Sequence, residues 1–175
     1  MEVTHYQDNV GTINSVYPPT EYLTFGPWIY MVPQFKPQSV LLLGYAGGTV
    51  AGLIRLLYGD VPITAVDIEP CEDRYGVDLI TTDAEKFVKI CGKYEVVVID
   101  LFPNSSFYVC DFILKEEFVA NLKRIAKYII INTVNNPDLS AYKVFKHVGT
   151  NKPYKLGNKI YYFSNGDTHK LYPLW

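Results

Sequence analysis

The stretch from Ser39 to Pro70 constrains the fold more than any other part of the chain. Residues 40–43 form an unbroken apolar run, which is typical of a parallel strand buried on both faces. Apolar residues then recur at helical spacing from Val50 to Leu57, and Gly59 is suited to end that helix. A second apolar run, residues 63–66, follows. The pattern predicts a strand–helix–strand unit with parallel strands.

Three glycines lie between the first strand and the helix: Gly44, Gly47 and Gly48. Glycine lets the backbone turn sharply and lets a ligand come close to it. The start of a helix also offers unpaired N–H groups and the positive end of the helix dipole. Asp67 follows the second strand, 23 residues after Gly44, where a carboxylate can accept hydrogen bonds from ribose hydroxyls. This favours nucleoside binding; the alternative is that the turn and the acid are only structural.

The positions of the glycines in this turn argue against a dinucleotide as the ligand. A dinucleotide fingerprint has glycine at its first, third and sixth positions. Those positions hold Gly44, Ala46 and Thr49 in this chain. A pyrophosphate site is therefore not the preferred interpretation.

The remaining elements alternate in the same way. Asp67 is followed by polar residues without helical periodicity, so the second crossover is predicted to be a loop. Strands are predicted at 77–80, 95–100 and 128–131, and helices at 83–91, 114–127 and 137–145. Lys155 to Ser164 is typical of a hairpin on a two-residue turn at Gly157-Asn158. The prediction is one α/β sheet, mostly parallel and seven-stranded, with an antiparallel C-terminal hairpin and helices on both faces.

At this point the residues are familiar, because residues 41–49 and 66–70 read LLLGYAGGT and VDIEP. They resemble the Rossmann-like, class I superfamily of S-adenosylmethionine-dependent methyltransferases, and more closely its spermidine-synthase-like branch. The resemblance covers about residues 39–164 and implies S-adenosylmethionine, or alternatively its decarboxylated form, as cofactor. The cofactor-binding residues it implies are Gly44, Tyr45, Ala46, Gly47, Gly48, Asp67, Ile68, Asp83, Ala84, Asp100 and Leu101.

Two of these acids have alternative interpretations. Asp83 is placed to cap the helix that follows it, while the resemblance implies that the Asp83-Ala84 pair holds the adenine amino group; one residue can do both. Asp100 ends an apolar strand at the edge where ligands bind in open α/β sheets. It is the candidate catalytic residue, which would position a nucleophile and ease its deprotonation. The alternative is that it accepts backbone N–H groups of residues 102–105 and only orders that loop.

The chain departs from spermidine synthases at two positions. The Asp-x-x-Asp-type motif of that family is here Asp100 to Pro103, so the second acid is missing. The acid that the family carries inside the glycine turn is replaced by Gly47. That acid would repel the carboxylate of intact S-adenosylmethionine, so both departures argue against polyamine synthesis.

Length, charge and cysteine content limit the partners, ligands and cellular location that the sequence predicts. The 175 residues suit one domain, and a net charge of −2 gives no broad signal for nucleic acid. No apolar run is long enough to span a membrane. Three cysteines, far apart in the sequence, fit a reducing cytoplasm, and their spacing to histidines predicts no metal site. Residues 1–36 are predicted to be an N-terminal arm or remnant hairpin, with an apolar cluster that makes a homodimer plausible, and residues 37–175 form the cofactor-binding domain.

The sequence therefore predicts an enzyme, an S-adenosylmethionine-dependent transferase. A methyltransferase acting on an unknown acceptor is the preferred function. A polyamine aminopropyltransferase of reduced size and a non-catalytic nucleoside-binding protein with the same fold are the alternatives.

Overall fold

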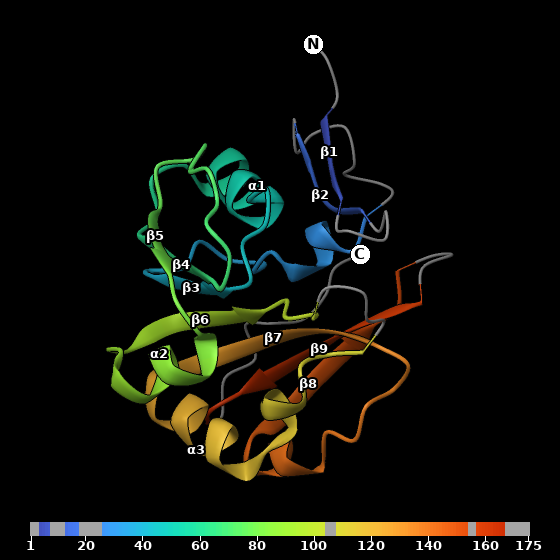
Figure 1. Ribbon diagram of the computed structural model, residues 1–175. Helices are drawn as coiled ribbons and strands as arrows, with labels where there is room; N and C mark the ends of the chain where they lie inside the picture. The colour runs from blue at the N-terminus through green and yellow to red at the C-terminus, as the bar shows by residue number, and fades with distance from the viewer. Residues whose placement is uncertain (1–3, 8–12, 18–25, 104–107, 154–156, 167–175) are drawn as a thin grey trace.

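The computed structural model describes residues 4–7, 13–17, 26–103, 108–153 and 157–166. Its main feature is a seven-stranded sheet in the order β5-β4-β3-β6-β7-β9-β8 (Figure 1). Strands β3 to β7 pair in parallel, and β9 pairs antiparallel with both β7 and β8. The strands are β3 (Val40–Leu43), β4 (Ile63–Asp67), β5 (Asp78–Thr81), β6 (Tyr94–Ile99), β7 (Ala126–Val134), β8 (Lys146–Asn151) and β9 (Asn158–Ser164). The predicted fold class is confirmed.

Helices cover both faces of the sheet (Figure 1). α1 (Thr49–Tyr58) packs on one face, and α2 (Ala84–Ile90) and α3 (Glu116–Ile125) pack on the other. Side chains alternate along a strand, so Leu42 and Val98 belong to the apolar cluster beneath α1, whereas their odd-numbered neighbours belong to the cluster beneath α2 and α3. This burial on both faces explains why β3 and β6 read as unbroken apolar runs.

The connection from β4 to β5 contains no helix, as predicted from its polar sequence. Arg55 of α1 holds this loop by donating from its guanidinium to the carbonyls of Tyr75, at 2.9 Å, and Gly76, at 2.8 Å. It also donates to the carbonyl of Val61 before β4. The loop is therefore held by hydrogen bonds from Arg55, and its Cys71, Tyr75 and Val77 pack against the apolar cluster beneath α1.

The C-terminal hairpin is confirmed, although its first strand is not where the sequence predicts it. β8 ends at Asn151, and Asn158 is already the first residue of β9. The predicted turn residue Asn158 therefore lies in a strand and pairs with Val134 of β7. Lys155 and Leu156, predicted to form the other strand, lie outside the described residues.

Three predicted boundaries need correction. The helix predicted at 114–127 is a 3-10 turn, η3 (Asp111–Leu114), followed by the shorter α3. The strand predicted at 128–131 is the nine-residue β7. The helix predicted at 137–145 is wrong, because only the 3-10 turn η4 (Ser140–Val144) forms there.

The N-terminal segment contains an antiparallel hairpin of β1 (Thr4–Gln7) and β2 (Ile13–Tyr17). The 3-10 turn η2 (Trp28–Met31) then places two buried side chains in the cluster beneath α1. The domain boundary at residues 36 and 37 stays a prediction. Within the described ranges, every helix is too short or too polar to cross a bilayer.

Candidate functional site

The candidate site lies where β3, β4 and β6 end side by side. Leu43 pairs with Val66 on one side and with Ile99 on the other. The residues that follow these three, Gly44, Asp67 and Asp100, are therefore neighbours at one edge of the sheet. This edge, formed by the carboxyl ends of parallel strands, is where ligands bind in open α/β folds.

Gly44 is the point at which the chain leaves β3, and its geometry admits only glycine. Its φ is 91°, a region that L side chains rarely adopt. A Cβ atom added here would lie 2.1 Å from the carbonyl oxygen of Asp100. Two backbone bonds of 2.8 Å, from Gly44 N–H to Val66 O and from Asp100 N–H to Leu43 O, fix this close approach. The glycine therefore brings the turn directly onto the end of β6.

Tyr45 contributes its backbone to the turn, whereas its side chain lies in the core. The residue is 4% exposed and belongs to the cluster beneath α1. A Cβ atom at Gly48 would lie 2.5 Å from the Tyr45 ring, so the turn closes over the phenol. Burial raises the pKa of Tyr45 to about 12, and its hydroxyl lies 3.5 Å from Asp73. A ligand over this turn would meet main-chain atoms rather than the phenol.

Asp67 binds the glycine turn. Its Oδ2 accepts hydrogen bonds from the N–H groups of Tyr45 and Ala46, at 2.8 and 2.9 Å, and Oδ1 accepts from that of Glu69, at 3.0 Å. An ionised carboxylate has about four acceptor positions, so at most one is left. A ribose that used both of its hydroxyls here would have to displace one of these N–H groups.

Ile68 and Leu101, the predicted residues that directly follow Asp67 and Asp100, differ in exposure. Ile68, directly after Asp67, is 69% exposed, so an apolar side chain faces solvent beside the turn. Leu101 is partly buried against the cluster beneath α2 and α3, and its Cδ2 lies 3.5 Å from the position of a Cβ on Gly44.

Asp83 caps α2, as one of its two interpretations predicts. Its Oδ1 accepts a 2.8 Å hydrogen bond from the N–H of Glu85. Ala84 is buried at the start of the helix. The Thr82 N–H donates to the carbonyl of Asp67 at 2.8 Å, which brings the start of α2 next to the end of β4. The adenine role of the Asp83-Ala84 pair stays a prediction.

Asp100 faces the α1 side of the sheet, because Val96 and Val98 on its strand do. Its Oδ1 accepts a 2.9 Å hydrogen bond from Nδ2 of Asn132. Burial and the negative charge of Asp67 raise the pKa of Asp100 to about 6, while the bond from Asn132 lowers it. Among the described residues Asn132 is its hydrogen-bond partner; residues 104 and 105, named in the alternative interpretation, lie outside them.

The sequence reasoning missed Asn132 and Asn158. Asn132 is 3% exposed, and its Oδ1 accepts from Nδ2 of Asn158 at 2.9 Å. A signal for Asn132 exists, because it follows Ile131 at the end of an apolar run, as Asp100 follows Ile99. Those two isoleucines pair across β6 and β7. No comparable signal exists for Asn158, which reads as a turn residue.

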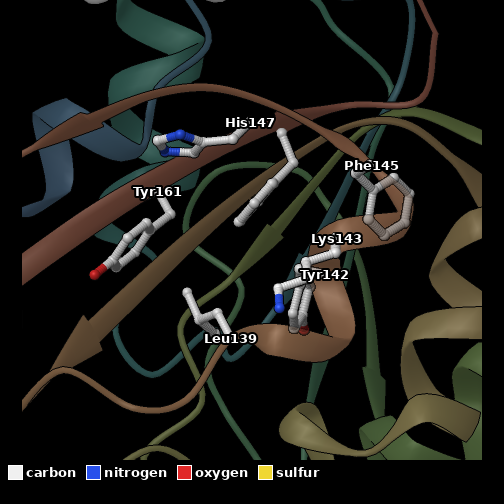
Figure 2. Close-up of a pocket in the computed structure, with 7 residues that line it drawn as sticks. Leu139, Tyr142, Lys143, Phe145, His147 and Tyr161 are labelled. Carbon is white, nitrogen blue, oxygen red and sulfur yellow. The ribbon is translucent and has the colours of Figure 1, made fainter.

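A separate apolar hollow of about 390 Å³ lies over β8, β9 and η4, and it shares no residue with the glycine turn (Figure 2). It is lined by Leu139, Tyr142, Lys143, Phe145, His147, Tyr161 and Phe163. Three of these rings, those of Tyr142, Phe145 and Phe163, are already buried against one another. The hollow is therefore largely the outer surface of a packed aromatic cluster.

Comparison with known proteins agrees with this architecture. No family model matches the chain. It is 24% identical over 127 residues to a polyamine aminopropyltransferase of Vibrio vulnificus, a match that covers 64% of this chain. The match spans 41% of the length of that curated relative.

Solved structures give a more extensive match. Human methyltransferase-like protein 13, in complex with SAH, has a TM-score of 0.66 and 17% identity over 88% of this chain and 82% of that one. A probable spermidine synthase from Corynebacterium glutamicum has a TM-score of 0.60 and 19% identity over 74% and 57% of the two chains. The chain thus has the Rossmann-like fold that methyltransferases and spermidine-synthase-like proteins share.

Proposed function

We propose that the protein is an S-adenosylmethionine-binding transferase, and most simply a methyltransferase. The observation that carries this proposal is the convergence of Gly44, Asp67 and Asp100 at one edge of the sheet. The fold, shared with a human methyltransferase-like protein in complex with SAH, supports the choice of cofactor.

In this proposal the adenosine lies over the glycine turn. The ribose would bind at Asp67, in exchange for a turn N–H, and Ile68 would offer its exposed apolar surface to the adenine. Asp83 would use its second carboxylate oxygen for the adenine amino group while Oδ1 continues to cap α2. The close approach at Gly44 would leave the methionine end of the cofactor beside Asp100.

Transfer from a sulfonium needs little acid–base chemistry, because the leaving group is a neutral thioether. The enzyme must align the nucleophile and leave it deprotonated. A partly buried carboxylate whose pKa is raised to about 6 is suited to accept a hydrogen bond or a proton from such a nucleophile. Asp100 is the group that we propose for this role, with an acceptor that is still unknown.

One observation favours a second function. The curated relative is a polyamine aminopropyltransferase, which points to decarboxylated S-adenosylmethionine. Two residues oppose it. Gly47 lacks the carboxylate that would repel the intact cofactor, and Pro103 stands where the resembled motif has its second acid.

We also propose a cytoplasmic location for the transferase, which the three unpaired cysteines fit.

Isothermal calorimetry with S-adenosylmethionine, S-adenosylhomocysteine, decarboxylated S-adenosylmethionine and NAD tests the assignment. We expect saturable binding of the first two and no binding of NAD. Asp67→Asn should weaken binding at least tenfold, about 1.4 kcal/mol. Asp78→Asn is the matched control, because that exposed acid lies at the opposite end of the parallel strands.

Three results would redirect the proposal. Tenfold tighter binding of the decarboxylated cofactor would favour the aminopropyltransferase. Binding of NAD alone would exclude both transferases. Binding of S-adenosylmethionine without transfer of a labelled methyl group to any amine, hydroxyl or thiol acceptor would favour a non-catalytic nucleoside-binding protein.

A further inference from the structure

Two asparagines, the buried Asn132 and the partly buried Asn158, connect the C-terminal hairpin to the candidate catalytic residue. Asn158, at the start of β9, donates from Nδ2 to Oδ1 of Asn132 on β7 at 2.9 Å. Asn132 in turn donates from Nδ2 to Oδ1 of Asp100 at 2.9 Å. We call these three residues the Asn–Asn–Asp chain. It crosses three neighbouring strands at the same edge of the sheet.

The chain has one direction, which follows from the chemistry of its members. An ionised carboxylate only accepts hydrogen bonds. Asn132 must therefore present its NH₂ group to Asp100 and its carbonyl oxygen to Asn158, which must then present its own NH₂ group. A protonated Asp100 could donate instead and would not require this order. The orientation of the two amides is therefore the one that an ionised Asp100 requires.

Pairing of β7 with β9 does not require this chain. The backbone ladder between the two strands runs from Tyr128 to Val134. Thr133, next to Asn132, bridges the same two strands by donating to the carbonyl of Lys159 at 3.1 Å, without reaching Asp100. A buried amide needs hydrogen-bond partners, and Asn132 has them in Asp100 and Asn158 rather than in the backbone ladder of β7 and β9.

We propose that Asn132 and Asn158 are positioning residues, which keep Asp100 ionised and occupy one of its oxygens so that the other is available to the ligand. This inference rests on the proposed function for the identity of that ligand. It assigns the hairpin strand β9 a part in the site, although β9 carries none of the predicted site residues.

The opposing influences on the pKa of Asp100 show why Asn132 and Asn158 matter. Burial and Asp67 act against the ionised form of Asp100, and the bond from Asn132 acts for it, with a resulting pKa of about 6. About nine tenths of the molecules would be ionised at pH 7. Without the bond, the pKa would be higher still, and a larger fraction of the molecules would carry a proton at neutral pH. Asn132 therefore favours the ionised form of Asp100.

Carbon-13 NMR of the Asp100 carboxyl, titrated in the ligand-free protein, tests the inference directly. We expect Asn132→Ala to raise the titration midpoint by about one pH unit or more. Asn158→Ala should shift it in the same direction by less, since it frees the Asn132 amide to rotate. Thr133→Val, which removes a neighbouring bond between the same strands, should leave the midpoint unchanged.

The inference is overturned if Asn158→Ala leaves the midpoint unchanged, or if Thr133→Val shifts it as much as either asparagine variant. Asn158 is only partly buried, so that variant stays informative if Asn132→Ala does not fold. A parallel calorimetric titration with S-adenosylhomocysteine separates the two proposals. Absence of binding would contradict the proposed function while the NMR midpoints still decide the role of the asparagines.

Discussion

Replacing Gly44 with alanine tests whether the close approach of the glycine turn to β6 holds the site together. Two separate costs follow from the structure. The backbone conformation at φ 91° costs an L residue about 1–2 kcal/mol. The new Cβ would also lie 2.1 Å from a carbonyl oxygen. A main-chain atom cannot rotate away, so overpacking adds about 1–3 kcal/mol.

The expected loss is therefore about 2–5 kcal/mol out of the roughly 5–15 kcal/mol that stabilise a domain of this size. Gly76→Ala is the matched control. Gly76 also has a positive φ, 63°, but nothing lies within 4 Å of its Cβ position. That variant should show the backbone cost alone, about 1–2 kcal/mol.

Urea denaturation of both variants, followed by circular dichroism, gives the two free energies of unfolding. Their difference isolates the contact with the carbonyl of Asp100. Equal losses of unfolding free energy in the two variants would refute the reasoning, because they would mean that the end of β6 can move away from the new Cβ atom at little cost. A larger loss for Gly44→Ala, together with a shifted Asp100 signal in NMR spectra, would support it.

Three further predictions concern single side chains. Asp67→Asn keeps only one acceptor oxygen, so it should lose about 1.5–3 kcal/mol of stability in urea melts, whereas the exposed Asp78→Asn should change nothing. Because burial raises the pKa of Asp100 from 3.8 to about 6, the native state binds a proton that the unfolded chain has released. Its free energy of unfolding should fall by about 3 kcal/mol as pH rises from about 4 to 6, and Asp100→Asn should flatten that profile. Tyr142→Phe removes a buried 2.8 Å bond to a main-chain carbonyl and should cost about 1–2 kcal/mol; Tyr128→Phe, whose buried hydroxyl has no partner among the described residues, should cost nothing in the same assay.

Sequence patterns correctly predicted those parts of the fold that depend on short-range signals rather than on tertiary packing. The unit from β3 to β4 was found because its apolar periods, glycines and following acid are all short-range signals. The segment from Asn135 to Phe145 shows the opposite case. Asn135 and Asn136 adopt positive φ values of 60° and 50°, and only one 3-10 turn follows. Burial of Tyr142 and Phe145 in the aromatic cluster overrides helical propensity there.

Strand β8 could not be predicted for a related reason. Residues 146–151 have no clear alternation, and they form a strand because β9 lies beside them. A strand that forms because of the strand beside it leaves little trace in the pattern of its own residues.

The candidate site was predictable in position but not in its contacts. Parallel topology placed Asp67 and Asp100 at one edge. It could not show that turn N–H groups occupy the carboxylate of Asp67, nor that the Tyr45 phenol lies in the core. The partner of Asp100 depends on the register between β6 and β7, a tertiary property that one sequence does not display.

The insertion of β9 between β7 and β8 has a consequence for the order of synthesis. β7 ends at Val134 and β9 begins at Asn158, 24 residues later. At ribosomal rates of about 5–20 residues per second, β7 waits roughly one to five seconds for its partner. β8 emerges earlier, but in the sheet of described residues it pairs with β9 and not with β7. During that interval the edge of β7, with Tyr128 to Ile131 along it, is open to other chains. Nascent chains that stall before β9 should therefore aggregate more readily than chains released after β9 is complete.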